Sequence, residues 1–342
     1  MTSRDCIHRV SCRPMFARAR DSWIGRGAVA VAVLIVVVVA CTLVVAPKPI
    51  ARLMPTASPS PTPTLSPSPT ASPTPAPTPK PKPSPLLSKR ITVLVLGTDS
   101  NASRLRRGMG KLTDSIMVLS VNAKHTQVSM ISFPRDMVDI PTGNGGVWSL
   151  KINALTYYRG EAAMKRAIAT TIGQPINYYL EINMEDFGRL VNGIGGIDVI
   201  VPASIYDPSI GLNIRAGRRH MNGNLALSYA RSRHTTSDWD RAARQQLILT
   251  AIVRKLVNPK TKFHLSGLIP TLKTLRTDMP LAQVSTFVQI ARLSAKARVI
   301  GGVLAPPAFA GFTGIEPGTG RGWIQEPNLS AIRSYARALF AR

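Results

Sequence analysis

The chain has few cysteines, few aromatic residues and few acidic residues. Its three cysteines, Cys6, Cys12 and Cys41, all precede residue 50 of 342, so the rest folds without a disulfide or a thiolate-bound metal. Phe, Trp and Tyr make up 6% of the residues, which leaves little for base stacking and disfavours nucleic acid as a partner. No Gly-x-Ser-x-Gly motif occurs, which disfavours a serine hydrolase.

Acidic residues are outnumbered by basic ones. There are 17 Asp and Glu against 43 Lys and Arg, a formal net charge of +26. Such a surplus favours anionic partners, among them phosphates, acidic lipids and anionic wall polymers. An arginine-rich proteome would give the same excess, so charge alone does not choose among them.

Residues 28–46 carry no charge and, with the residues just before them, reach the length of about 20 that spans a bilayer. Six arginines and two aspartates precede this run, whereas only Lys48 and Arg52 follow it closely. The positive-inside rule predicts a single-pass protein of the plasma membrane, with a cytoplasmic basic stub at 1–27 and an extracellular C-terminal domain. A cleaved signal peptide ending near Cys41 is the alternative, and it exports the domain equally.

Residues 47–89 are rich in Pro, Ser and Thr and are predicted to be a disordered linker without a core. It is either a stalk that crosses part of a cell wall or a linker with no required length.

Beyond residue 90, strand-like and helix-like segments alternate, which predicts an α/β (α+β layered) domain. We expect a catalytic domain at 90–258 and a C-terminal part, 259–342, that packs on the same domain. Strands are expected at 91–96, 116–121, 127–133, 177–183 and 197–201, and helices at 161–172, 185–193, 222–230, 239–257, 281–294 and 328–341.

Two aspartates lie at the ends of neighbouring predicted strands. Asp99 follows the first strand and Asp114 precedes the second. A pair of carboxylates in this arrangement suits a magnesium ion when a phosphate completes its ligands. Single aspartates after strands are otherwise common in turns.

The helix at 239–257 carries polar side chains at its start. Asp238 stands where an N-cap belongs, and Arg241 and Gln245 follow on the same face with Arg244 beside them. Arg231 and Arg233 lie just upstream. A solvated helix face is the ordinary interpretation, but so many positive and amide groups at one end favour a bound anion such as pyrophosphate. Lys151 is either a further phosphate contact or a surface lysine.

Seven motifs together resemble the LytR–CpsA–Psr (LCP) family of bacterial cell-envelope glycopolymer transferases. They are Leu96–Asp99, Asp114–Met117, Ser132–Asp136, Lys151–Ala154, Leu190–Val199, Leu227–Arg233 and Asp238–Gln246, in order over roughly half the chain.

The resemblance implies a central mixed β-sheet flanked by helices and a magnesium-dependent phosphotransferase acting in cell-wall assembly. Such an enzyme moves a glycopolymer from undecaprenyl pyrophosphate to peptidoglycan. Asp99 and Asp114 would bind Mg²⁺, and Asp238 would orient arginines or accept a proton. The pyrophosphate would lie among Arg135, Arg231, Arg233, Arg241, Arg244 and Gln245, and the polyprenyl tail in an apolar groove between sheet and helices.

Two departures from the family pattern concern the substrate. The segment between Asp99 and Asp114 is long and basic, which leaves open which arginine of 104–107 faces the donor, and Gly160-Glu161 stands where the family often has two glycines. Two other functions remain open: a non-catalytic envelope protein that binds polyprenyl pyrophosphates, and a pyrophosphatase that uses water as the acceptor.

Overall fold

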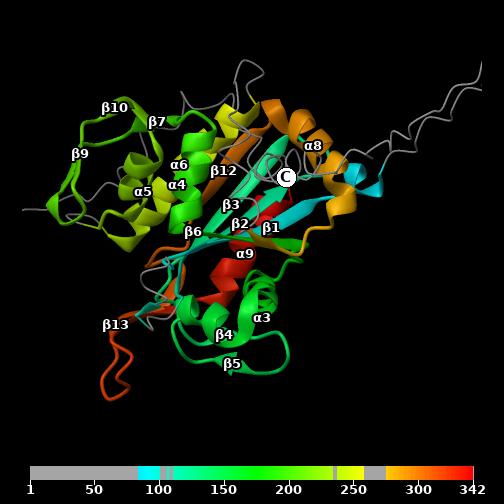
Figure 1. Ribbon diagram of the computed structural model, residues 1–342. Helices are drawn as coiled ribbons and strands as arrows, with labels where there is room; N and C mark the ends of the chain where they lie inside the picture. Colours follow the sequence, from blue (N-terminus) through cyan, green and yellow to red (C-terminus); the bar gives the residue numbers. More distant parts are fainter. Residues whose placement is uncertain (1–83, 101–105, 108–110, 234–236, 258–274, 342) are drawn as a thin grey trace, which may run out of the picture.

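The computed structural model describes residues 84–100, 106–107, 111–233, 237–257 and 275–341, and a mixed six-stranded sheet lies at its centre (Figure 1). The β6–β1 and β3–β12 pairs are parallel and the other three are antiparallel. The expected α+β fold with a mixed central sheet is therefore confirmed. Across the sheet the order is β11 (Arg276–Thr277), β6 (Tyr178–Asn183), β1 (Ile91–Thr98), β2 (Thr113–Val121), β3 (Gln127–Phe133) and β12 (Arg298–Val303).

Helices cover both faces of the sheet, as Figure 1 shows. One face packs on α3 (Leu155–Ile172) and α9 (Leu329–Phe340). The other packs on α4 (Met184–Gly193), α5 (Gly223–Arg231), α6 (Asp238–Val257) and α8 (Val284–Leu293). Successive side chains of a strand point to opposite faces, so Val93 joins the α4–α8 core and Leu94 the α3–α9 core. Because helices shield both faces of the sheet from solvent, these strands are nearly continuous apolar runs.

Four two-stranded pairs lie outside the central sheet. They are β4 (Ile140–Pro141) with β5 (Val147–Trp148), β7 (Ile197–Val201) with β10 (Gly217–Met221), β8 (Ile205–Asp207) with β9 (Leu212–Ile214), and β13 (Ala310–Ile315) with β14 (Trp323–Pro327). Short 3-10 helices are η1 (Pro85–Ser88), η2 (Ile152–Ala154), η3 (Pro208–Ile210), η4 (Leu281–Gln283) and η5 (Ser294–Lys296).

The expected strands and helices are present, with small shifts at their ends. The largest shift is in α3, which starts at Leu155, but Gly160 has φ 79° and ψ 171° and interrupts the helix, so its regular part starts at the expected position. Gly173 ends α3 in the left-handed conformation, φ 63°, which only glycine adopts at little cost. The same Gly160-Glu161 step that departs from the family pattern is thus a kink in this chain.

Two expectations are wrong in detail. Residues 85–88, assigned to the linker, form η1, and Leu86 and Leu87 pack against the core. Asp238 is not the N-cap of α6, because the Arg241 amide donates to the Ser237 carbonyl at 3.1 Å and the Asp240 amide to the Ser237 hydroxyl at 3.1 Å. Asp240 accepts in return from the Ser237 amide at 3.0 Å, which completes a capping box. The Asp238 carboxylate is thereby available to the arginines around it.

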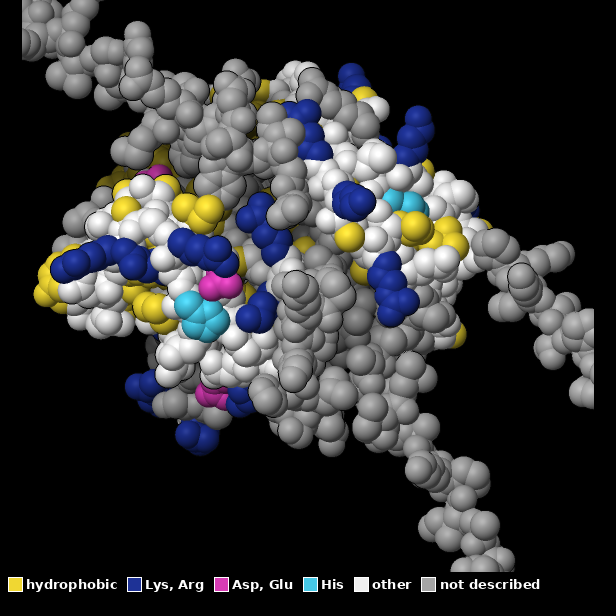
Figure 2. Space-filling model, turned by 90° about the horizontal axis from the view of Figure 1, so that it is seen from above, with side chains coloured by type: hydrophobic (Ala, Val, Ile, Leu, Met, Phe, Trp, Pro, Cys, Tyr) yellow, Lys and Arg dark blue, Asp and Glu magenta, His cyan; other side chains and the backbone are white. Residues whose placement is uncertain are grey.

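Within the described residues, no helix combines the length and the apolar composition needed to cross a bilayer. The span expected at 28–46, the stub before it and most of the linker lie outside those residues. The surplus of basic side chains is visible on the face shown in Figure 2, where Lys and Arg are spread widely and acidic groups are few.

Candidate functional site

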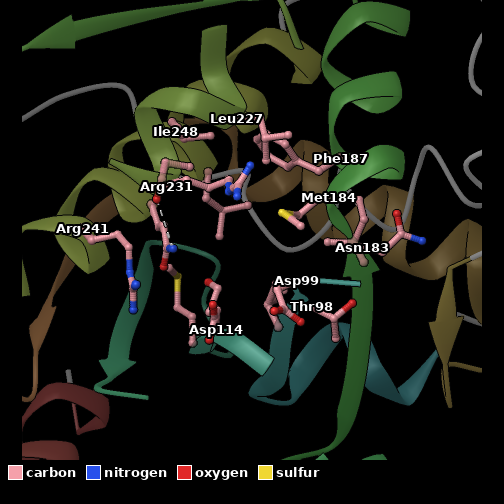
Figure 3. Close-up of a pocket in the computed structure, with 18 of the residues that line it drawn as sticks. Thr98, Asp99, Asp114, Asn183, Met184, Phe187, Leu227, Arg231, Arg241 and Ile248 are labelled. Carbon is pink, nitrogen blue, oxygen red and sulfur yellow. Dashed lines mark hydrogen bonds between the residues drawn. The ribbon is translucent and has the colours of Figure 1, made fainter. Parts of the chain in front are cut away.

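A cavity of about 530 Å³ opens between the ends of β1 and β2 and the helices α4, α5 and α6 (Figure 3). Its lining divides into two parts by chemistry. The polar part is lined by Gly97, Thr98, Asp99, Arg107, Asp114, Ser115, Arg135, Asn183, Arg231, Arg233, Arg241 and Gln245. The apolar part is lined by Val95, Met117, Ile182, Met184, Phe187, Leu190, Leu227, Ala230, Ile248, Leu249 and Ile252.

The two predicted metal-binding aspartates lie together at one end of the sheet. Thr98 pairs with Thr113 across β1 and β2, so Asp99 and Asp114 follow at the same edge, and Figure 3 shows them next to each other with Arg231 across the cavity. Asp99 is held in place by Leu112, whose amide donates to Oδ1 at 3.0 Å while the Asp99 amide donates to the Leu112 carbonyl at 3.0 Å.

Arg135, which follows β3, joins several carboxylates. Its Nη1 donates to Asp114 Oδ1 at 2.9 Å, and its Nε lies 3.5 Å from both Asp136 Oδ2 and Asp238 Oδ2. Burial of the guanidinium opposes its charge, yet the three carboxylates raise the pKa of Arg135 above its usual value. Lys151, the residue before η2, contacts one of these carboxylates, with its Nζ 2.8 Å from Asp136 Oδ1.

Asp238 is shared by three arginines. Its Oδ1 accepts from Arg233 Nε at 2.7 Å and lies 3.5 Å from Arg241 Nη1, and Arg135 approaches its other oxygen. Burial favours the neutral acid, but Arg241, Arg233 and Arg135 outweigh it and lower the pKa of Asp238. The carboxylate is therefore ionised throughout the neutral range and holds the arginines together.

Arg241 is the most deeply buried of the arginines that line the cavity. The residue is 6% exposed, and its Nε is buried without a hydrogen-bond partner among the described residues. Burial lowers the pKa of Arg241 although Asp238 opposes this. A buried cationic N–H that stays unpaired is costly, so an anion in the cavity would stabilise this side chain.

The end of α5 brings two further arginines to the cavity. Arg231 stands in the last turn of α5 and Arg233 two residues on, both exposed to the solvent of the cavity region. The chain between them is fixed by buried Asp207, which accepts from the Ser232 hydroxyl at 2.8 Å and the Arg233 amide at 3.3 Å. Gln245 Nε2 donates to the Ala230 carbonyl at 3.4 Å, which joins α6 to the same turn.

Two of the predicted substrate-binding residues are not among the described residues that line the cavity: Arg244 and Lys151. Arg244 is 5% exposed, donates from Nε to the Tyr229 carbonyl at 3.1 Å and from Nη2 to the Ser232 carbonyl, and stacks on the Tyr229 ring at 5.9 Å. It joins α6 to the end of α5. The structure thus gives Arg244 a positioning role and places Lys151 beside Asp136.

The sequence alone predicted neither which apolar residues line the cavity nor which arginine of the 104–107 segment faces it. Arg107 lines the cavity, whereas 101–105 and Arg104 with them lie outside the described residues. Most of the apolar lining comes from α4, α5 and α6, and the rest from β1, β2 and β6. In the helices, core residues and cavity residues share the same period, so periodicity does not separate them. Asn183 was also missed; it caps α4 by accepting from the Asp186 amide at 2.9 Å and lines the cavity as well.

In the described part of the chain, no cluster of three or more His, Cys, Asp or Glu side chains could hold a metal by itself. The two aspartates at the strand ends therefore offer only part of a coordination shell. Magnesium is often bound in this way, by one or two carboxylates with substrate phosphates and water supplying the remaining oxygens. The donors present are of the chemical type that this ion prefers.

Comparisons with known proteins bear on the family and on the fold. The family model of the LytR_cpsA_psr family matches residues 70–301. A polyisoprenyl-teichoic acid–peptidoglycan teichoic acid transferase TagU from Bacillus mycoides is 31% identical over 170 residues, 49% of this chain and 53% of that protein. The chain thus spans about half the length of this relative.

Two solved structures share the fold. TagV from B. subtilis has a TM-score of 0.57 at 23% identity, covering 74% of this chain and 98% of the other. TagT bound to LIIa-WTA has a TM-score of 0.57 at 18% identity, covering 75% and 92%. The chain belongs to the LytR_cpsA_psr family.

Proposed function

We propose that this protein is a transferase that moves a glycopolymer from a polyprenyl pyrophosphate, such as undecaprenyl pyrophosphate, to peptidoglycan during cell-wall assembly. One observation carries the proposal: an arginine-rich part and an apolar part are continuous in a single cavity. A lipid pyrophosphate has the same two parts, a multiply charged head joined to a hydrocarbon tail. The TagU relative is named for action on a polyisoprenyl-linked polymer and peptidoglycan, which supports this substrate class.

The head group would lie among the arginines at the polar end. Arg231 at the end of α5, Arg233 two residues after it and Arg241 in α6 all line that end. Arginine suits this task because its planar fork donates two hydrogen bonds to phosphate oxygens and stays charged when buried. The buried unpaired Nε of Arg241 gains an acceptor when phosphate binds.

The tail would extend along the apolar lining between α4, α5 and α6. Phe187, Leu227 and Ile248 are prominent there (Figure 3). Burying hydrocarbon stabilises a complex by about 25 cal/mol per Å², so a tail with several isoprene units would add considerably to affinity. A soluble nucleotide would leave this part of the cavity unused.

Magnesium would be held by Asp99 and Asp114, with phosphate oxygens of the donor completing the shell. When bound, the ion would neutralise charge on the phosphate oxygens as the bond to the leaving group breaks. The chain's own residues carry out the remaining tasks: Arg135 fixes the orientation of Asp114 through its 2.9 Å hydrogen bond, and Leu112 fixes that of Asp99.

In the proposed reaction an acceptor hydroxyl of peptidoglycan attacks the phosphorus that carries the glycan, and polyprenyl phosphate leaves. The arginines hold the departing phosphate and stabilise the charge that develops on it. Asp238 is a weak base because three arginines lower its pKa. In this proposal Asp238 therefore orients the arginines, and Asp99, a carboxylate that lines the cavity, would accept the proton of the acceptor hydroxyl.

The membrane anchor belongs to the same proposal. The apolar run at 28–46 would hold the protein in the plasma membrane as a single pass with the N-terminus cytoplasmic and the catalytic domain extracellular. This topology brings the domain to the side where peptidoglycan and flipped lipid-linked polymers meet.

The test uses the full-length chain in detergent with a synthetic polyprenyl-pyrophosphate glycan and peptidoglycan fragments, with and without Mg²⁺. We expect coupled product and polyprenyl phosphate in equal amounts, with turnover lost in Asp114→Ala and Arg231→Ala. Arg292→Ala, which changes an exposed arginine on α8, is the matched control. Polyprenyl phosphate released without coupling would instead identify a pyrophosphatase, and binding without either product an envelope-binding protein. Full turnover by Asp114→Ala would refute the assignment of the site.

A further inference from the structure

Aromatic side chains gather beside the charged end of the site. The chain has four tryptophans, and the three among the described residues, Trp148, Trp239 and Trp323, lie around the short segment 136–141. Trp148 pairs with Ile140 in the β4–β5 ladder. Trp323 opens β14, whose Gln325 donates its amide to the Asp136 carbonyl at 3.1 Å and accepts from the Val138 amide at 3.0 Å.

These rings contact one another in two groups. Trp239 and Trp323 have centroids 6.0 Å apart, and Trp239 Nε1 donates to Gln325 Oε1 at 3.4 Å. Trp148 lies 6.0 Å from Tyr158, which packs edge-to-face on Tyr157 at 4.9 Å. We call these five residues, Trp148, Tyr157, Tyr158, Trp239 and Trp323, the aromatic rim.

Three of the five side chains of the aromatic rim are exposed, and the other two are half-buried. Tyr158 is 62% exposed, Tyr157 55% and Trp323 38%. In a chain with so few aromatic residues, several large rings held in fixed contact at the surface mark a binding site more often than chance placement. Trp148 also packs against the α3–α9 core and Trp239 is half-buried, but burial in the core does not account for the other three rings.

The aromatic rim lies next to the charged residues around the candidate site. Trp148 Nε1 donates to the Lys151 carbonyl at 3.1 Å, and Lys151 Nζ lies 2.8 Å from Asp136. Trp239 follows Asp238 in the chain. Arg321 connects the two groups, since its Nη1 donates to the Ser149 carbonyl at 2.9 Å and it precedes Trp323 by two residues.

We infer that the aromatic rim binds sugar rings of the acceptor glycan, an inference that rests on the proposed transferase function. A pyranose has an apolar C–H face that packs on the electron-rich face of an aromatic ring, and hydroxyl edges that pair with indole N–H and phenol O–H groups. A rim of amphipathic rings fits such a chain better than it fits hydrocarbon, which already has the apolar lining between α4, α5 and α6. Sugars held there would place a hydroxyl near Asp136 and Arg135.

Part of this surface lies beyond the region that the family model matches, residues 70–301. Trp323 and Arg321 come from the β13–β14 segment after it. The proposed acceptor site thus includes residues on both sides of the end of the matched region, and it would set the acceptor preference rather than the donor preference.

The test measures binding of N-acetylglucosamine tetrasaccharide and of peptidoglycan glycan strands to the full-length chain in detergent, by calorimetry and without donor. We expect Tyr158→Ala and Trp323→Ala each to weaken binding about tenfold, the size of one lost aromatic contact with its buried area. Tyr158→Phe keeps the ring and should retain affinity. The control is Tyr206→Ala, an equally exposed tyrosine on β8, which should bind as the wild type does.

Donor-free binding separates this inference from the proposed function. Glycan binding that depends on the aromatic rim supports the inference even if no transfer is observed. Unchanged affinity in folded Tyr158→Ala and Trp323→Ala variants would overturn it, even if the enzyme transfers glycopolymer. Should Trp323→Ala fail to fold, Tyr158→Ala decides alone, because its side chain is the more exposed. In turnover assays, the same variants should raise the half-saturating acceptor concentration and leave that of the donor unchanged.

Discussion

Lys111 is predicted to neutralise a carboxylate inside the sheet. Glu181 in β6 is 4% exposed, and its Oε1 contacts Lys111 Nζ, whereas Oε2 has no hydrogen-bond partner in the described part of the chain. Glu161 lies 4.0 Å from the same Nζ and pairs with Arg276 at 3.0 Å. Lys111 thus stands between two carboxylates, one of them almost fully buried.

Lys111→Met keeps the length of the side chain and removes its charge. Loss of one partner of a buried ion pair costs about 3–5 kcal/mol because the other charge stays buried. The Lys111 side chain is 21% exposed, so water relieves part of this cost, and we expect a loss of about 3 kcal/mol in the free energy of unfolding at neutral pH. For a domain of this size that lowers the unfolding midpoint by roughly 6–12 °C.

The loss should depend on pH in a defined direction. Burial raises the pKa of Glu181, and Lys111 opposes that rise. Without Lys111 the pKa rises further. The pKa of an unfolded glutamate is about 4.3. When the folded protein raises that pKa, the free energy of unfolding falls as pH rises from the unfolded pKa to the folded one. The deficit of Lys111→Met is therefore largest at neutral pH and shrinks as acid protonates Glu181.

The assay is urea-induced unfolding followed by tryptophan fluorescence at several pH values. Lys124→Met, which changes an exposed lysine, is the matched control and should shift stability by less than about 0.5 kcal/mol. Lys111→Met combined with Glu181→Gln should recover most of the loss, because no buried charge is left unpaired. The reasoning fails if Lys111→Met is as stable as the wild type at pH 7, or if the double variant is no better than the single one.

Three further predictions concern the groups that build the cavity. Gly223→Ala should lose about 1–3 kcal/mol in urea unfolding, because a Cβ there would meet the Gly188 carbonyl oxygen at 2.1 Å and separate α5 from α4; Gly311→Ala, with nothing within 4 Å, is the control, and equal stability of the two variants would contradict this. Asp238→Asn should be less stable than the wild type at neutral pH, and the difference should vanish as pH falls well below about 3.9, because the depressed pKa of Asp238 gives stability that acid removes; a difference that persists in acid would argue against it. Arg244→Lys should cost about 2 kcal/mol in the same assay, since lysine cannot reach two carbonyls and stack on a ring, and an unchanged midpoint would show that the guanidinium contributes nothing.

The spacing of hydrophobic residues was enough to predict the strands and helices whose core contacts repeat regularly. Strand β1 is an example, since its continuous apolar run is typical of a strand that is buried on both faces. β12 was missed because Gly301 and Gly302 interrupt its pattern. The reason is steric: a Cβ on Gly301 would meet the Met130 carbonyl oxygen at 2.2 Å, so close approach to β3 requires glycine where propensity disfavours it.

For the candidate site, the sequence predicted which residues come together more successfully than how each is used. Asp99, Asp114, Arg135, Arg231 and Arg241 all line one cavity. They stand next to strand ends and near helix ends, which meet at one edge of a layered fold. The roles they are assigned there stay predictions.

Arg244 shows the limit of that reasoning. It lies only three residues beyond Arg241, yet its guanidinium turns to the carbonyls that end α5. Those acceptors are backbone atoms, which every sequence has, so no pattern of side chains reveals them. The N-cap of α6 was missed for a similar reason, since Ser237 and Asp238 are both good capping residues and only geometry separates them.

The last helix also governs when the domain can fold. Ile332, Ala336, Leu339 and Phe340 of α9 fill the core beneath the sheet, and the Leu339 carbonyl accepts hydrogen bonds from Gln127 and Ser129 of β3. A growing chain makes β3 about 200 residues before it makes α9. Until α9 has left the ribosome, α3 alone covers that face of the sheet, and the core that the two helices share stays incomplete.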